Sequence, residues 1–177
     1  MEDASEDGED GEDARTDPVF VLIRGLLYGS LFVGLALVLL PASVLRFSGV
    51  VRPAEYGLAQ GAGIGLVLLG SAVAVSCVLF FAFVGRGTPA PFDAPRRLVT
   101  RGPYRFVRNP MYMSALLVLG GAALYYESAW LLAYAALLAA VADLFVRHYE
   151  EPRLARTFGA EYAAYCRRVR RWWPGVS

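Results

Sequence analysis

The chain has 177 residues, of which 56% are hydrophobic and 19% are charged, and its mean hydropathy is +0.44. Soluble globular domains carry about 25% charged residues, so this composition argues against a soluble domain. The net charge of +1 conceals two opposite parts. Residues 1–17 hold nine acidic residues and one arginine, a charge of −8, whereas the rest of the chain holds 16 arginines and seven acidic residues, a charge of +9.

The acidic segment at the start of the chain, residues 1–17, has no apolar residue larger than alanine after Met1. It repels itself and has nothing to bury, so it is predicted to be a disordered tail. A secretory signal needs a positive flank before its apolar stretch, and this flank is negative. Residues 18–177 are therefore predicted to form one all-α, integral-membrane domain whose first apolar segment is retained as an anchor.

Four segments are long and apolar enough to cross a bilayer, which takes about 20 helical residues. The predicted transmembrane helices cover residues 19–40, 61–84, 110–126 and 128–151.

Signals at the ends of these segments set their limits. Pro41 is expected to stop the first helix, and Pro152 to interrupt the fourth. Asn109 is expected to cap the third helix, with Pro110 at its first position. Only Glu127 and the predicted cap Ser128 separate the third and fourth helices, which predicts an antiparallel hairpin.

Gly61 and Gly65 of the second segment have the four-residue spacing that allows two membrane helices to approach closely. Helix packing explains them better than contact with a ligand. His148 is the only histidine in the chain, which excludes a two-histidine metal site, and no metal is expected.

The arginines give the orientation, because cytoplasmic loops of membrane proteins are enriched in basic residues. The connection between the second and third segments and the C-terminal tail are both rich in arginine. Both are therefore predicted to be cytoplasmic, as is the N-terminus, with the plasma membrane as the expected location. The arginines of the connection are Arg86, Arg96, Arg97, Arg101, Arg105 and Arg108, and those of the C-terminal tail are Arg153, Arg156, Arg167, Arg168, Arg170 and Arg171.

The connection from Gly85 to Tyr112 is long and rich in proline. Loops of this length without secondary structure are unusual unless they are functional. Binding of anionic lipid head groups would explain its arginines, but not the prolines or Tyr104 and Tyr112. The loop is therefore predicted to be preorganised for a ligand.

A charged stripe lies near the end of the fourth segment, where Asp143, Arg147, Glu150 and Glu151 follow one another at helical spacings. Ionisable groups at this depth usually face the bundle interior and are functional. Two interpretations stay open: the carboxylates bind a polar ligand, or Arg147 simply pairs with Asp143 and Glu151.

Residues 153–172 predict an amphipathic, basic helix at the membrane interface, on the cytoplasmic side of the bundle. It would lie as a lid beside the mouth of the bundle, and Gly159 is expected to weaken or bend it.

Two motifs carry a family resemblance: Leu98–Tyr112, which reads LVTRGPYRFVRNPMY, and Glu150–Tyr165, which reads EEPRLARTFGAEYAAY. With the helical hairpin between them and a closing Pro174, they resemble the isoprenylcysteine carboxyl methyltransferase family and the related phospholipid N-methyltransferases. The resemblance covers about half of the chain.

The resemblance implies an integral-membrane enzyme that uses S-adenosylmethionine without a Rossmann domain and methylates a lipid-like acceptor. Glu150, Glu151 and Arg147 would be the catalytic residues. Asparagine at 109 replaces the histidine of the isoprenylcysteine enzymes. The implied cofactor contacts are Arg96, Arg97, Leu98, Val99, Tyr104, Asn109, Pro110, Met111, Tyr112 and Glu150.

Several functions remain open at this stage. The acceptor could be an isoprenylcysteine-type carboxylate or a phospholipid amine. A membrane sterol-type reductase with a nicotinamide cofactor would also suit the arginine-rich loop. A non-enzymatic scaffold would use Gly61 and Gly65 to associate, and self-association into a homo-oligomer is left open. Nothing in the sequence indicates a nucleic-acid partner.

Overall fold

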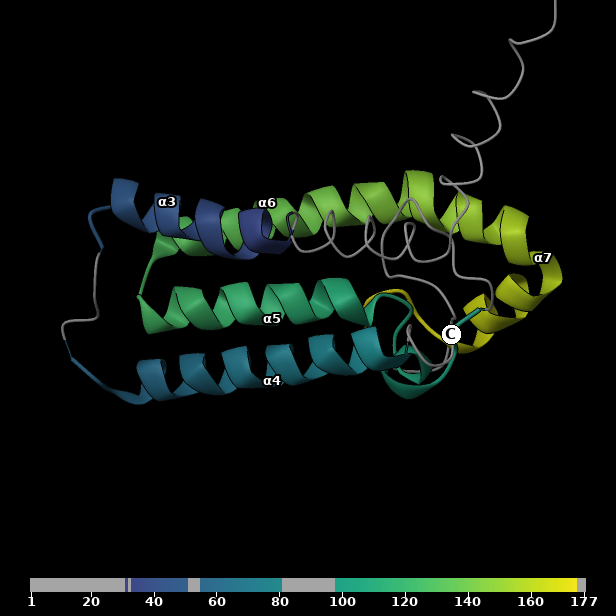
Figure 1. The fold of residues 1–177 in the computed structure, drawn as a ribbon, viewed down its shortest axis with the longest axis horizontal. Helices are drawn as coiled ribbons and strands as arrows, with labels where there is room; N and C mark the ends of the chain where they lie inside the picture. The colour runs from purple at the N-terminus through teal and green to yellow at the C-terminus, as the bar shows by residue number, and fades with distance from the viewer. Residues whose placement is uncertain (1–30, 32, 51–54, 81–97, 175–177) are drawn as a thin grey trace, which may run out of the picture.

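The computed structural model describes residues 31, 33–50, 55–80 and 98–174. Within these ranges the secondary structure is entirely helical, as predicted. Figure 1 shows the long helices running side by side along the longest axis, with the chain turning back at both ends. The elements are η1 (Leu35–Leu39), α3 (Leu40–Phe47), α4 (Leu58–Phe80), η3 (Gly102–Arg105), α5 (Pro110–Tyr125), α6 (Ala129–Phe145), η4 (Val146–Glu150) and α7 (Glu151–Arg168).

Two helices are long and apolar enough to cross a membrane: α4, and the continuous helix Ala129–Arg168 formed by α6, η4 and α7. Only 17% and 22% of their most apolar windows are buried in the protein, so they are not core helices of a soluble domain. The helices Leu35–Phe47 and Pro110–Tyr125 are apolar but shorter.

The first predicted helix does not stop at Pro41, and this prediction is wrong. The chain stays helical through α3 to Phe47. The π-helical turn η1 comes directly before, and the N–H of Leu40 donates to the carbonyl of Leu35. Pro41 then occupies the first turn of α3, where a missing N–H is tolerated. The predicted residues 19–30 lie outside the described part of the chain.

Helices α4 and α5 pack at backbone contact, but not through the predicted pair Gly61 and Gly65. A Cβ on Gly63 would lie 2.6 Å from the carbonyl oxygen of Gly121, and one on Gly70 would lie 2.7 Å from that of Ser114. Among the described residues, no atom lies within 4 Å of such a Cβ on Gly61 or Gly65. Residues two apart on an α-helix differ by about 200°, so Gly63 faces α5 while Gly61 and Gly65 face away.

The α5–α6 hairpin is confirmed. The Oγ of Ser128 accepts a hydrogen bond from the N–H of Leu131 at 3.3 Å and caps α6. Glu127 has a positive φ of 49°, which lets the chain reverse within two residues. Asn109 stands at the cap position of α5, but its side chain makes no capping hydrogen bond there.

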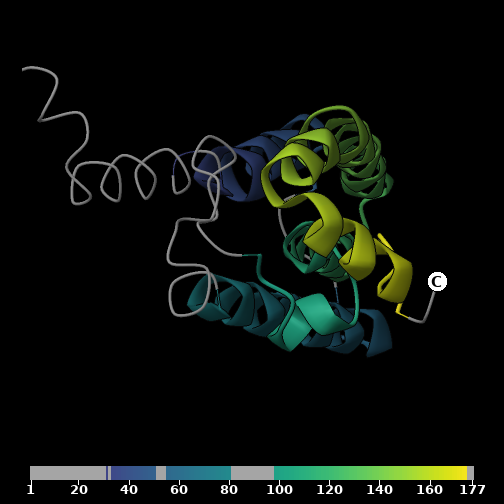
Figure 2. The same ribbon diagram turned by 90° about the vertical axis from the view of Figure 1, so that its right-hand side faces the viewer.

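The fourth predicted helix is not interrupted at Pro152, contrary to expectation. The π-helical turn η4 leads directly into α7, in which Pro152 lies in the first turn. Gly159 bends α7 as predicted, with φ 48° and ψ −120°. The second half of α7 then crosses the end of the bundle, as the yellow ribbon in Figure 2 shows. The helix ends at Arg168, four residues before the predicted limit.

Candidate active site

The bundle gathers its ionisable groups at the end where α5 begins and η4 passes into α7, on the right in Figure 1. Tyr112, in the first turn of α5, donates its hydroxyl hydrogen to Oε2 of Glu150 at 2.8 Å. In the part of the chain that the structure describes, no arginine pairs with Glu150. Its carboxylate is therefore held by a neutral donor and has no direct cationic partner among the described residues.

Glu151, the next residue, is in the opposite state. Its carboxylate accepts two parallel hydrogen bonds from Arg171, at 2.8 and 2.6 Å, and lies 3.2 Å from Nη1 of Arg108. The hydrogen bonds to Glu151 raise the pKa of Arg171 further. Bidentate arginine–carboxylate pairs are strong and geometrically specific, so Glu151 is a structural junction.

The sequence left two interpretations of the charged stripe open, and the internal ladder holds for only part of it. Arg147 pairs with Asp143 at 2.7 Å, as the internal ladder requires. Glu151 does not complete that ladder, because it binds Arg108 and Arg171 instead. Asp143 also accepts a hydrogen bond from the indole N–H of Trp172 at 2.8 Å.

The loop residues implied by the resemblance pack into two buried clusters. Val99 and Tyr104 lie with Cys77 of α4, and Met111 packs against them. Leu98 packs against the α7 side, on the cluster of Tyr162, Tyr165 and Val169. Through these contacts the loop is attached both to α4 and to α7.

A hydrogen bond connects the two clusters. The hydroxyl of Tyr165 donates to the carbonyl oxygen of Tyr104 at 2.6 Å. The 3-10 turn η3 is thereby fixed beneath α7.

The side chain of Asn109 is buried and donates to the backbone carbonyl of Arg171 at 3.4 Å. Pro110 is buried at the first position of α5. The structure therefore brings Asn109, Tyr112 and Glu150 to the same end of the bundle. Arg96 and Arg97, with the preceding residues 81–95, lie outside the described residues.

Three residues of this site were missed by the sequence interpretation: Arg108, Arg171 and Trp172. All three contact the carboxylates of the stripe. Arg108 directly precedes Asn109 in the resemblance motif, and the run RRVRRWW ends the basic helix. Nothing in this run indicates locally that these residues leave the interface helix and turn back to the bundle.

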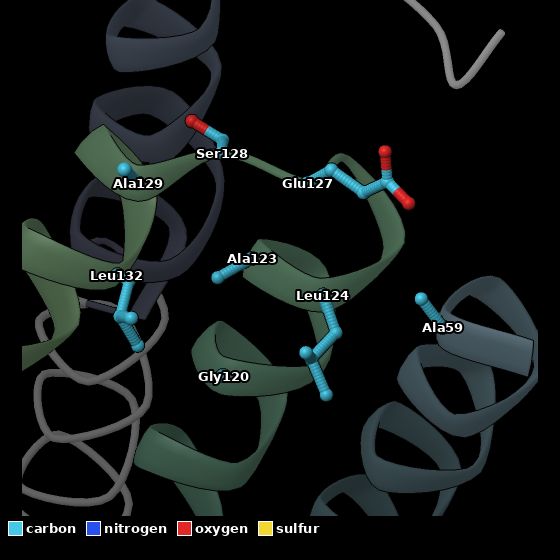
Figure 3. Close-up of a pocket in the computed structure, with 8 residues that line it drawn as sticks. All are labelled: Ala59, Gly120, Ala123, Leu124, Glu127, Ser128, Ala129 and Leu132. Carbon is cyan, nitrogen blue, oxygen red and sulfur yellow. The ribbon is translucent and has the colours of Figure 1, made fainter.

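An apolar pocket of about 210 Å³ lies at the other end of the bundle, beside the α5–α6 turn. Its lining has two polar side chains, Glu127 and Ser128, and offers no cation. Figure 3 shows these two at the turn and the apolar lining on α4, α5 and α6. This pocket lacks the groups that a charged cofactor needs. Its lining is Ala59, Gly120, Ala123, Leu124, Glu127, Ser128, Ala129 and Leu132.

The apolar helices and the carboxylates at one end of their bundle define a small helical membrane protein with an ionisable site. Residues 58–161, more than half of the chain, match the phospholipid methyltransferase family, and the chain belongs to this family. No curated protein and no solved structure matched it in the same comparisons. The predicted resemblance is confirmed: the protein is an S-adenosylmethionine-dependent methyltransferase.

The residues at this site fit such a cofactor. S-adenosylmethionine carries a positive sulfonium and an amino group, and the uncompensated carboxylate of Glu150 lies beside the ring of Tyr112, which suits a cation. The cofactor also carries a carboxylate. Among the described residues, the Nε of Arg108 is buried and has no hydrogen-bond acceptor, which leaves a donor for such a group.

Proposed function

We propose that the protein methylates the amine of a phospholipid head group, with Tyr112 and Glu150 at the centre of the site. The supporting observation is the difference between neighbouring carboxylates. Glu151 is neutralised by two arginines, whereas Glu150 is held by a tyrosine hydroxyl alone among the described residues. An uncompensated carboxylate attracts an ammonium group and repels a carboxylate, so this site favours an amine acceptor.

The state of Arg147 supports the same choice. An isoprenylcysteine-type acceptor brings a carboxylate, for which the resemblance offers an arginine near Val146 and Arg147. Val146 is fully buried, and the guanidinium of Arg147 is engaged by Asp143. Val146 carries no charge, and the ion pair with Asp143 weakens the attraction of Arg147 for an incoming carboxylate.

The chemistry asks little of this chain beyond placement. When bound, the cofactor supplies a methyl group that is already activated by its sulfonium. The protein has to align the acceptor, exclude water and take up a proton, because a protonated amine has no lone pair for the new N–C bond. Glu150 would accept that proton directly or through water, and Tyr112 would hold its carboxylate in place.

We also propose a topology in which four helices cross the membrane and both termini and the active site are cytoplasmic, in the plasma membrane. The arginines of the loop and tail support this orientation. The helices Leu35–Phe47 and Pro110–Tyr125 would complete the set begun by the two long helices.

The test uses full-length protein in liposomes with methyl-labelled S-adenosylmethionine. Vesicles that contain phosphatidylethanolamine should yield labelled lipid, and a farnesylated cysteine analogue with a free carboxylate should yield no labelled ester. Glu150→Gln should abolish most of the lipid signal, with Trp173→Leu, a substitution at an exposed position, as the control. Labelling of the farnesylcysteine carboxylate instead of the lipid would contradict the proposal.

A further inference from the structure

The chain does not simply end after α7 but folds back over the polar site. At Val169 the backbone becomes extended, with φ −129° and ψ 127°, and we refer to Val169–Pro174 as the C-terminal strap. Its backbone is attached to the start of α5: the N–H of Arg108 donates to the carbonyl of Arg170 at 2.9 Å, and Asn109 donates to the carbonyl of Arg171 at 3.4 Å.

The side chains of the strap bind the two carboxylates that flank Glu150 along the chain. Arg171 forms the bidentate pair with Glu151, and Trp172 donates its indole N–H to Asp143 at 2.8 Å. The strap therefore connects the beginning of α5, the end of α6 and the beginning of α7. Helix α5 carries Tyr112, and Glu150 is the last residue of η4, the turn between α6 and α7.

Trp172 also contacts Tyr112 directly. Their ring centroids are 6.3 Å apart and the ring planes meet at 75°, an edge-to-face arrangement. Because the indole is held by Asp143, it fixes the side of the Tyr112 ring against which it packs. Tyr112 in turn donates to Glu150, so a chain of contacts runs from Asp143 through Trp172 and Tyr112 to Glu150.

We propose that Trp172 is a positioning residue for S-adenosylmethionine binding, which acts by fixing Tyr112 and, through it, the carboxylate of Glu150. The proposal rests on the placement of the cofactor at Tyr112 and Glu150, and it does not depend on which acceptor is methylated. Trp172 itself need not touch the cofactor. The strap would thus complete a site that α5 and η4 only outline.

The test measures cofactor affinity by calorimetry, with full-length protein in nanodiscs and with S-adenosylmethionine and S-adenosylhomocysteine as probes. Trp172→Leu removes both the ring contact and the N–H donor and should raise Kd about tenfold. Trp172→Phe keeps an aromatic edge against Tyr112 and should restore Kd to within about threefold. Trp173→Leu is the matched control, because Trp173 is the next residue and is 74% exposed.

The binding stoichiometry separates positioning from a structural role. A merely structural defect would lower the fraction of competent protein and leave Kd unchanged, whereas loss of positioning raises Kd and the KM for the cofactor at full stoichiometry. An unchanged Kd in Trp172→Leu, or an equal increase in Trp173→Leu, would overturn the proposal.

If Trp172→Leu does not fold, Asp143→Leu provides a second test. It removes the acceptor of the indole N–H together with the ion-pair partner of Arg147, leaves both rings in place, and should raise Kd about threefold. An unchanged Kd in that variant refutes the role of Trp172. Because calorimetry needs no acceptor, failure of phosphatidylethanolamine methylation would refute the acceptor assignment alone.

Discussion

The closest backbone approach in the bundle gives a sharp test of the structure. Gly63 of α4 and Gly121 of α5 face each other, and a Cβ on either would lie 2.6 Å from the carbonyl oxygen of the other. In contrast, a Cβ on Gly61 or Gly65 meets no atom of the described part of the chain within 4 Å. The same glycine-to-alanine change can therefore be made at a packed pair, Gly63 and Gly121, and at an open pair, Gly61 and Gly65. The two pairs differ in the direction in which the new methyl group points.

The expected magnitude follows from two opposed effects. Replacing a helical glycine with alanine gains about 1 kcal/mol of helix propensity. At Gly63 the methyl group meets backbone, which cannot rotate away, and overpacking of this kind costs about 1–3 kcal/mol, or more where the backbone must shift. We expect Gly63→Ala and Gly121→Ala to lose about 2 kcal/mol of unfolding free energy, and Gly61→Ala and Gly65→Ala to lose none.

Thermal unfolding of the purified protein in detergent measures the difference. At about 2–4 °C per kcal/mol for a chain of this size, the first pair of variants should melt about 4–8 °C below the wild type, and the second pair at or above it. Equal melting temperatures for Gly61→Ala and Gly63→Ala would refute the rotation of α4 described above. A larger decrease in melting temperature for Gly61→Ala than for Gly63→Ala would support the packing face of Gly61 and Gly65 that the sequence predicted.

Three further substitutions test the polar end of the bundle. Glu150→Gln removes the uncompensated charge and should weaken calorimetric binding of S-adenosylmethionine about tenfold while the melting temperature stays within about 2 °C; unchanged binding would exclude Glu150 from the site. Glu151→Gln leaves two arginines without their carboxylate and should instead cost about 2 kcal/mol of stability in thermal unfolding; a stable variant would refute the junction. Gly102→Ala should also destabilise the protein in that assay, because φ is +62° and the ring of Phe80 occupies the place of its Cβ; a wild-type melting temperature would contradict this packing of the loop against α4.

Features that depend on neighbouring residues in the chain could be predicted from the sequence. Two residues between apolar segments leave room only for a hairpin, and Ser128 caps α6 as its position suggested. Gly159 bends α7 because a glycine tolerates a positive φ that other residues rarely adopt. These predictions needed no knowledge of the partner helices.

Pro41 and Pro152 show where local rules failed. Each was expected to end a helix, and each instead follows a π-helical turn, at the first turn of a new α-helical segment. The wider π-helical turn relieves the clash between the proline ring and the carbonyl group of the preceding turn. Proline itself has no N–H that would need an acceptor. A π-helical turn contains one residue more than an α-helical turn. The sequence does not show where such a turn forms, because the surrounding packing decides its position. The rotation of α4 escaped prediction for a similar reason: glycines lie on several faces, and only the position of α5 selects among them.

The proximity of two candidate site residues could be predicted from the sequence, but the pairing of the carboxylates could not. The motif placed Tyr112 and Glu150 in one site, and the structure brings them into contact at 2.8 Å. The roles of Glu150 and Glu151 could not be separated from sequence, because both carboxylates stand side by side in one motif. Their separation requires the return of Arg171, twenty residues later, which no local pattern announces.

The two glutamates differ because adjacent residues on a helix point about 100° apart. One direction leads to Arg108 and Arg171, and the other to Tyr112. One arginine balances the charge of Glu151, and the second adds a positive charge that lies near Glu150 without forming an ion pair with it among the described residues. A cationic ligand at Glu150 therefore meets one attractive carboxylate in an environment whose second carboxylate is already balanced. The pairing of Arg108 and Arg171 with Glu151 leaves Glu150 without a direct cationic partner among the described residues, and the proposed amine methylation needs such a carboxylate.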